Sequence, residues 1–129
     1  MILVTGSAGY IGSHLTHYFE KNKIDYIGID NLSYSYKTNV LKKNKHFFTD
    51  ISNKKKIKKI LETYKPKTVI HAAAASYVLE AEQRKTKYFL NNIIKTKQFI
   101  NLCKDSKVKN FIFLSSSNVY KETIKSNSL

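Results

Sequence analysis

The sequence predicts an α/β fold, in which a doubly wound parallel sheet of about five strands carries helices on both faces. Short, continuous apolar runs alternate along the chain with longer segments whose apolar residues recur at helical spacing. The short runs do not alternate between polar and apolar residues, and strands of that kind belong in parallel sheets covered on both sides. Because crossovers between parallel strands are right-handed, the intervening helices fall on both faces of the sheet.

Five apolar runs supply the predicted strands, and three amphipathic segments supply the helices. The strands are expected at residues 2–4, 26–29, 46–48, 68–71 and 111–114. Helices are expected over residues 10–22, over a lysine-rich segment that Ser52 caps and that ends before Pro66, and over about residues 80–105. The core positions predicted on the third helix are Phe89, Leu90, Ile93, Ile94, Ile100 and Cys103.

Length and composition restrict the class of protein. The 129 residues suit one domain, residues 1–129, with one core. The single cysteine excludes an internal disulfide and a cysteine-based metal cage, and we predict no metal site. No apolar run approaches the roughly 20 residues of a membrane-spanning helix, and no signal-peptide pattern opens the chain. We therefore predict a cytoplasmic protein with no membrane partner.

The positive charge does not by itself predict a nucleic-acid partner. The formal net charge is +14, yet Arg84 is the only arginine among 23 basic residues. Proteins that read nucleic acids favour arginine, since its planar guanidinium contacts phosphates and base edges at two points. The longest basic run, residues 54–59, has Ile57, Ile60 and Leu61 at helical spacing, so its lysines form a solvated helix face. Nucleic-acid binding is the least expected function.

The sharpest functional signal is the segment Gly6-Ser7-Ala8-Gly9-Tyr10-Ile11-Gly12 between the first strand and the first helix. In that setting Gly6 permits the tight turn, Gly9 lets the backbone approach a pyrophosphate, and Gly12 lets the helix pack closely on the strand. The free N–H groups at a helix N-terminus attract phosphate groups. The segment therefore predicts a dinucleotide site at the first strand-to-helix turn.

Asp30 closes the second strand and sharpens that prediction. A carboxylate at this position accepts hydrogen bonds from an adenosine ribose and repels the additional phosphate of NADP. No arginine lies beside it to receive such a phosphate. The alternative interpretation is a strand-end acid that starts a turn with Asn31. We predict NAD as the cofactor.

Longer blocks of sequence resemble a known superfamily. They read TGSAGYIGSH at residues 5–14, DNL at 30–32, DI at 50–51, VIHAA at 69–73 and SSSNVY at 115–120. In this order they resemble the extended short-chain dehydrogenase/reductase superfamily, and within it the NAD-dependent epimerase/dehydratase family, above all its UDP-glucose 4-epimerases. The resemblance implies a Rossmann fold, bound NAD and a sugar-nucleotide substrate. It implies transient oxidation of the sugar at C4 and return of hydride to the other face.

The resemblance also assigns roles to particular positions. It places Tyr10 and Ile11 at the pyrophosphate turn, and Ser116 at the sugar 4-hydroxyl as the one catalytic candidate. It assigns cofactor contacts to Asp30, Asn31, Leu32, Ser33 and Ser35 around the ribose, Asp50 and Ile51 at the adenine, Ala72, Ala73, Ala74 and Ser76 beneath the nicotinamide half, and Asn92 on the third helix. From the residues alone, the alanines could equally pack a helix on a strand, Asn92 could be a surface amide, and the three serines could form a turn.

The sequence also departs from the family pattern. The family's chemistry needs a Tyr-x-x-x-Lys pair, whose lysine lowers the pKa of the tyrosine that takes the sugar proton. None of the nine tyrosines has a lysine four residues later. We therefore expect a C-terminally truncated domain that lacks the sixth strand, the catalytic helix and the substrate domain, and that is inactive as this fragment.

Several functions stay open at this point. Sugar-nucleotide dehydratases carry Asp-Glu directly after the position of Ser116, where this chain has Ser117-Asn118, which favours an epimerase or another NAD-dependent sugar-nucleotide reductase. A non-catalytic nucleotide-binding module is the alternative. An open sheet edge at the fifth strand predicts association, with a homodimer or a complementing C-terminal chain as the candidate partner.

Overall fold

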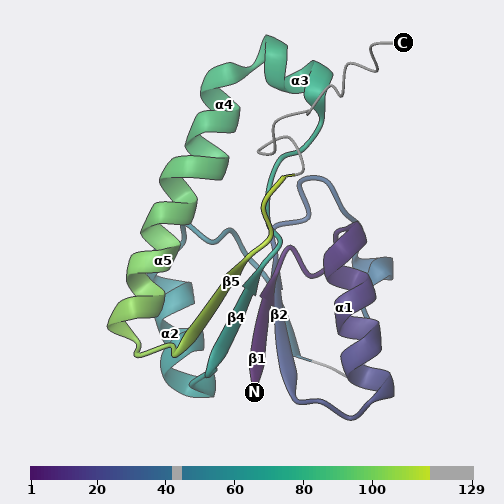
Figure 1. The fold of residues 1–129 in the computed structure, drawn as a ribbon, viewed down its shortest axis with the longest axis vertical. Helices are drawn as coiled ribbons and strands as arrows, with labels where there is room; N and C mark the ends of the chain where they lie inside the picture. The colour runs from purple at the N-terminus through teal and green to yellow at the C-terminus, as the bar shows by residue number, and fades with distance from the viewer. Residues whose placement is uncertain (42–44, 117–129) are drawn as a thin grey trace, which may run out of the picture.

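The computed structural model describes residues 1–41 and 45–116 and contains a five-stranded sheet (Figure 1). Its strands are β1 (Ile2–Thr5), β2 (Tyr26–Asp30), β3 (Lys45–Phe48), β4 (Thr68–His71) and β5 (Asn110–Phe113). They lie in the order β3-β2-β1-β4-β5, and every neighbouring pair is parallel. This arrangement confirms the predicted fold class, and each predicted strand lies within about a residue of the observed one.

The helices cover the two faces of the sheet unequally. Helix α1 (Tyr10–Lys21) lies alone on one side, while α2 (Lys54–Tyr64) and α5 (Thr96–Asp105) lie together on the other (Figure 1). The buried core on the α2 and α5 face is the larger, with residues such as Leu3, Ile27 and Phe99 completely covered. On the α1 face, Val4, Phe19 and Tyr26 form a smaller cluster. Within the described part of the chain, no helix is long and apolar enough to cross a membrane.

The third predicted helix is wrong in its continuity. Residues 78–105 form α3 (Val78–Gln83), α4 (Lys85–Phe89), the π-helical segment η2 (Leu90–Lys95) and then α5. Arg84 has the non-helical dihedrals φ −127° and ψ 47°, which end α3. A π-helix has wider turns than an α-helix, so the side chains before it do not follow the 3.6-residue period of those after it.

The core positions predicted on this segment are wrong for the same reason. Phe89, Leu90, Ile93 and Ile100 are between 40% and 56% exposed. Ile94 is half-buried, and Cys103 is buried as predicted. The side chains that α5 buries are Thr96, Phe99 and Cys103.

The cap of α2 also differs from its prediction by one residue. Asn53 precedes the helix, and its side-chain Oδ1 accepts a hydrogen bond from Lys56 N at 3.1 Å. The Ser52 hydroxyl instead donates to Asp50 Oδ1 at 2.7 Å. Asp50 competes for the serine because it lies in the turn that leads from β3 to the helix.

Candidate functional site

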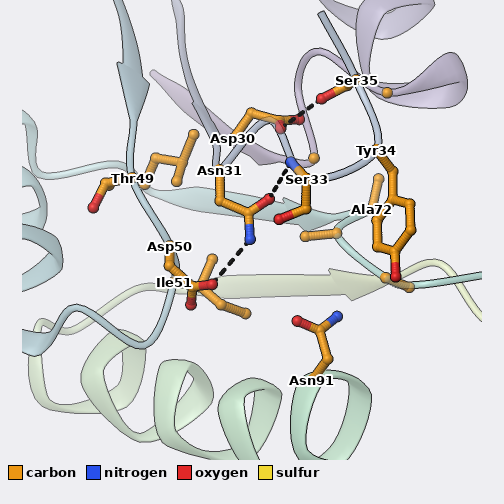
Figure 2. Close-up of a pocket in the computed structure, with 15 residues that line it drawn as sticks. Asp30, Asn31, Ser33, Tyr34, Ser35, Thr49, Asp50, Ile51, Ala72 and Asn91 are labelled. Atoms are coloured by element: carbon orange, nitrogen blue, oxygen red, sulfur yellow. Dashed lines mark hydrogen bonds between the residues drawn. The ribbon is translucent and has the colours of Figure 1, made fainter. Parts of the chain in front are cut away.

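The carboxyl ends of β1, β2 and β4 surround a pocket at the reversal point of the sheet. The chain leaves β1 toward β2 on one side, whereas β4 lies on the other side of β1. Connections diverge at such a point, and ligands of open α/β sheets bind in the resulting crevice. The pocket is formed by residues from five segments of chain (Figure 2), namely Gly6, Gly9, Ile29, Asp30, Asn31, Ser33, Tyr34, Ser35, Thr49, Asp50, Ile51, Ala72, Ala73, Ala74 and Asn91.

The turn after β1 depends on two glycines. Gly6 has φ +69°, and a Cβ there would lie 2.8 Å from the backbone of Ala72. A Cβ on Gly12, in the first turn of α1, would overlap the Gly6 carbonyl oxygen. Side chains at these positions would push the helix away from the strand. The predicted roles of both residues therefore have a steric basis in this fold, and the turn exposes the N-terminal end of α1 beside the pocket.

Asp30 ties the turn after β1 to the turn after β2. Its Oδ2 accepts a hydrogen bond from Ala8 N at 2.9 Å, and its Oδ1 accepts bonds from Leu32 N at 2.7 Å and from the Ser35 hydroxyl at 2.8 Å. The side chain is 8% exposed and lines the pocket. A carboxylate offers about four acceptor positions, so Asp30 keeps capacity for a ligand hydroxyl group.

Asp50 is more completely engaged than Asp30. Ser52 N and the Ser52 hydroxyl donate to its Oδ1, while Lys95 Nζ and Asn31 Nδ2 donate to its Oδ2 at 2.7 and 2.9 Å. Partial burial raises the pKa of this carboxyl, but the hydrogen bonds outweigh burial and hold the pKa well below its usual range. With four donors in place, Asp50 shapes the pocket wall and has little capacity left for a base.

A second hollow continues from the first along the loop after β4. It shares Ala72, Ala73 and Ala74 with the first pocket. The additional residues that line it are Ile11, His71, Ala75, Ser76, Asn92, Ile93, Thr96, Phe113, Leu114, Ser115 and Ser116. The small alanine side chains leave the backbone accessible along the shared part. Together the two hollows, which we call the track, extend from the end of β2 to the end of β5.

Adjacent asparagines on η2 line different hollows and are bonded to each other, since Asn91 Nδ2 donates to Asn92 Oδ1 at 3.1 Å. Asn91 lines the first pocket and points toward it (Figure 2). Asn92 lines the second, and its amide makes two bonds to one residue, accepting from Ala75 N and donating to Ala75 O, both at 2.9 Å. Asn92 therefore clamps the loop after β4, whereas the amide that faces the first pocket belongs to Asn91, which the sequence analysis missed.

His71 forms a buried polar bridge beneath the second hollow. Its Nδ1 lies 2.7 Å from the Thr5 hydroxyl and its Nε2 lies 3.1 Å from the Thr96 hydroxyl. The ring packs against Phe99, Phe111 and Phe113 at centroid distances of 5.6 to 5.8 Å. Burial lowers the pKa of His71 to about 4, so the imidazole is neutral at pH 7. His71 is a core residue, and it joins β1, β4 and α5.

Comparison with known proteins identifies the family. A family model described as "NAD dependent epimerase/dehydratase family" matches residues 2–128. The chain belongs to the NAD-dependent epimerase/dehydratase family. Its resemblance to that family, predicted from the motifs, is confirmed.

Relatives in this family are identical to the chain at somewhat more than a third of the aligned positions. It is 36% identical over 128 residues to the "Bifunctional protein GAL10" of Candida maltosa, covering 93% of this chain and 84% of that protein. It is 38% identical over 129 residues to a dTDP-D-glucose 4,6-dehydratase of Dictyostelium discoideum, covering 92% of this chain and 29% of the relative. The chain thus spans much less than half of that enzyme.

A solved family member has the same architecture. The crystal structure of UDP-glucose 4-epimerase from Brucella ovis in complex with NAD superposes with a TM-score of 0.88 at 32% identity. The superposition covers 94% of this chain and 37% of that one. The five-stranded unit described here therefore corresponds to a part of an epimerase fold.

The structure brings most of the predicted site residues to the track and leaves a few at its border. Tyr10 and Ile11 begin α1 and are 82% and 54% exposed, and Ile11 reaches the second hollow. Leu32 lines neither hollow and contributes its backbone N–H to Asp30, with φ +59°. Ser76 and Ser116 both line the second hollow. Ser117 and Asn118, on which the argument against a dehydratase depends, lie outside the described residues.

Four residues that line the first pocket were not predicted as site residues. They are Ile29, Tyr34, Thr49 and Asn91. Thr49 lies one residue beyond β3, at the end of a strand where ligand contacts are common, so its position could have been noted. Tyr34 lies in an irregular loop, and nothing in the sequence pattern points to it.

Proposed function

We propose that residues 1–129 form the NAD-binding domain of a UDP-glucose 4-epimerase-like protein. The observation that carries this proposal is the continuous track across the reversal point of the sheet, with Asp30 at one hollow, the glycine turn at the middle and Ser116 at the other. Supporting it are the family membership and the solved epimerase that holds NAD on the same architecture.

Each part of the track fits one part of the dinucleotide. The first hollow offers Asp30, with capacity for a ribose hydroxyl, and an apolar wall at Ile51 for the adenine. The turn at Gly6 and Gly9 lets backbone N–H groups approach the pyrophosphate. The second hollow offers space over Ala72–Ala74 for the nicotinamide half, bounded by Ser76 and Ser116. Asp30 favours NAD over NADP because its charge opposes an added phosphate.

We infer that this region binds the cofactor and that its residues alone do not complete the reaction. Bound NAD supplies the hydride acceptor and donor for a reaction at a sugar C4. The residues of this chain bind and orient the dinucleotide, and Ser116 lies where a sugar hydroxyl would approach it. The 129 residues contain no Tyr-x-x-x-Lys pair to move the hydroxyl proton. We therefore propose that these residues alone bind NAD without turning over a sugar nucleotide.

Two measurements on the purified chain test the proposal. NADH fluorescence titration should give saturable binding, which Asp30→Ala weakens and Asp25→Ala, an exposed aspartate before β2, leaves unchanged. Incubation with NAD and UDP-galactose should yield no UDP-glucose. Absence of NADH binding would overturn the cofactor proposal, and formation of UDP-glucose would overturn the proposed lack of turnover.

A non-catalytic nucleotide-binding module is the second candidate. The absence of a Tyr-x-x-x-Lys pair from the 129 residues supports it, because no other residues of this sequence match the proton-transfer pair of the family. Turnover on adding a chain that supplies the missing pair would favour the epimerase assignment; persistent NAD binding without complementation would favour the module. The edge strand β5, with Ile112 and Phe113 about half exposed, is where we propose such a complementing chain or a second copy would attach.

A further inference from the structure

The loop after β2 carries a tyrosine that lies on the wall of the first hollow. Tyr34 lines this hollow and lies next to Ala72, on the side of the pocket away from Asp50 and Ile51 (Figure 2). The loop is held at both sides of Tyr34, because Ser33 N donates to Asn31 Oδ1 at 3.0 Å and the Ser35 hydroxyl donates to Asp30. The backbone at Tyr34 is therefore fixed by the same residues that form the pocket.

The Tyr34 side chain crosses to the start of the α3 and α4 segment. Its hydroxyl donates to Glu80 Oε2 at 2.8 Å, and its ring lies 5.5 Å from the ring of Tyr77. Lys87 Nζ lies 5.1 Å from the centroid of the Tyr34 ring and 2.6 Å from Glu80 Oε1. We call the contact between Tyr34 and Glu80 the Tyr34–Glu80 bridge. It consists of the hydrogen bond from the Tyr34 hydroxyl, while the contacts of the ring with Lys87 and Tyr77 hold the ring in place.

Glu80 is the centre of this contact. Besides Tyr34 and Lys87, the Tyr88 hydroxyl lies 3.0 Å from Glu80 Oε2 and 2.9 Å from the Tyr77 carbonyl oxygen. Hydrogen bonds from Lys87 and Tyr34 lower the pKa of Glu80 to about 2, so its carboxylate is charged at neutral pH. Three donors, one from the loop after β2 and two from α4, therefore meet at one carboxylate, and Arg84 Nη1 lies 3.7 Å from it.

The position of the bridge relates it to the track. Tyr34 belongs to the first hollow, while Tyr77 and Glu80 follow directly after Ala72–Ser76, which line the second. Neither hollow is lined by Glu80, so the carboxylate lies outside the track. The bridge joins the loop on one side of the track to the chain on the other, near the alanines that both hollows share.

We propose that Glu80 is a positioning residue that holds Tyr34 across the cofactor path, so that a dinucleotide enters and leaves when the Tyr34–Glu80 bridge opens. This inference rests on the proposed binding of NAD. Because the bridge is closed in the structure, breaking it should speed both entry and exit. A side chain that merely formed a wall would, when altered, speed exit alone.

The test measures association and dissociation of NADH by stopped-flow fluorescence, with excess NAD to displace the bound NADH. Tyr34→Phe keeps the ring and removes the hydroxyl, and Glu80→Gln replaces the charged acceptor with an amide oxygen that forms a weaker, neutral hydrogen bond. Each should raise both rate constants about three- to tenfold, the effect of about one hydrogen bond of ordinary strength, and leave Kd within about twofold. The double variant should have the rate constants of Tyr34→Phe, because the substitution at Glu80 has no bridge left to weaken once the Tyr34 hydroxyl is gone.

Matched controls separate the bridge from general effects. Tyr36→Phe alters an exposed tyrosine in the same loop, and Glu62→Gln alters an exposed glutamate on α2 that pairs with Lys58. Both should keep the wild-type rate constants, and circular dichroism should be unchanged in all variants. If Tyr34→Phe does not fold, Glu80→Gln with Tyr88→Phe still tests the same carboxylate.

The outcomes distinguish this inference from the proposed function. Wild-type protein that does not bind NADH would overturn both. Wild-type binding with unchanged rate constants in Tyr34→Phe and Glu80→Gln would overturn the bridge alone. A rise in dissociation without a rise in association, or additive effects in the double variant, would also overturn it, since Tyr34 and Glu80 would then act separately.

Discussion

The two hollows of the track are built by different means. The first is surrounded by polar side chains that bond to one another, with Asp30 and Asp50 together accepting seven hydrogen bonds from the chain. The second is lined by alanines and apolar residues, and its polar groups hold the scaffold, as Asn92 holds Ala75. In the proposed complex with NAD, polar side chains of the first hollow select the ligand, whereas the second hollow offers open space beside accessible backbone.

This difference leads to separate expectations for the two hollows. The proposed recognition of an adenosine half needs acceptors and a fixed wall, which the first hollow offers in Asp30 and Ile51. The second hollow offers Ala72–Ala74 and Ser116. A change in one hollow should therefore affect the ligands of that hollow, whereas a change that displaces α1 should affect both.

Gly12→Ala should remove binding in both hollows, because the new methyl group would overlap the Gly6 carbonyl and displace α1. We expect at least a 100-fold loss of NADH affinity and a loss of about 1–3 kcal/mol in the free energy of unfolding. Titration and urea unfolding measure the two effects. Gly9→Ala is the matched control for stability alone, because a Cβ there would lie 3.2 Å from Gly6 O and should cost less free energy of unfolding, although it would hinder the proposed approach of the pyrophosphate. Equal losses of unfolding free energy in the two variants would contradict this steric account.

Asp30→Ala should weaken ligands of the first hollow regardless of what fills the second. Loss of a hydrogen bond to a charged acceptor corresponds to about a 10- to 100-fold lower affinity. AMP and NADH should therefore lose the same factor, measured by calorimetry for AMP and fluorescence for NADH. A loss for NADH without a loss for AMP would place the carboxylate's role elsewhere.

As the pH falls, the fold should lose stability through His71, which lines the second hollow, before it loses stability through Asp50 in the first hollow. Its pKa of about 4 in the folded protein lies below the ordinary 6.5, so the unfolded chain takes up the proton first as the pH falls. The stability contributed by neutral His71 is complete above pH 6.5 and is lost progressively down to about pH 4. At pH 5 the loss amounts to about 2 kcal/mol.

Urea midpoints at pH 7.5 and 5 measure this loss, and His71→Gln should flatten the dependence. Burial lowers the pKa of His46 as well, so His46→Gln is the control that keeps the part due to His71. The pKa of Asp50 is lowered as well, but its contribution to stability is lost only as the pH falls below about 4, outside the range of this measurement. A wild-type midpoint that does not change between pH 7.5 and 5 would contradict the buried neutral imidazole.

The adjacent asparagines should give the smallest but most selective effect. Asn91→Ala alters the first hollow and should weaken AMP and NADH about three- to tenfold alike, as expected for one hydrogen bond. Asn92→Ala releases the Ala75 loop and should weaken NADH by a similar factor while AMP binding is unchanged. Binding titrations with both ligands measure the split. Equal effects of the two variants on AMP would show that the hollows are not independent.

The sequence predicted those parts of the site where the local geometry restricts which residue type can occupy a position. The turn at Gly6 and Gly12 admits no side chain, and the acid at the end of β2 accepts hydrogen bonds from two neighbouring turns while it lines the pocket. Alanines after β4 likewise follow from the close approach of backbone. These residues depend on neighbours a few positions away, which a linear pattern records.

The parts that it missed depend on geometry that no pattern records. The family resemblance assigned a cofactor contact to Asn92 and none to Asn91. Neighbouring helical positions differ by about 100° in direction, and the wider turns of η2 change that direction further, so only the folded chain shows that Asn91 faces the first pocket. Phe89 and Ile93 match a helical core pattern but point outward for the same reason. The contact of Tyr34 with Glu80 joins residues 46 positions apart across an irregular loop, and only the folded chain brings them together.

The π-helical segment η2 also makes the number of residues between the pocket and the core critical. Residues Leu90–Lys95 set the angle between Asn91, at the first hollow, and the Phe99 and Cys103 side chains of α5 in the core. An added or removed residue that the wider turn does not absorb would rotate one end of the segment against the other by about 100°. Either the amide would then leave the pocket or the phenyl ring would leave the core. Apart from Asn91, Asn92 and Lys95, whose side chains the site uses, positions along this stretch should therefore tolerate substitution better than a change in its length.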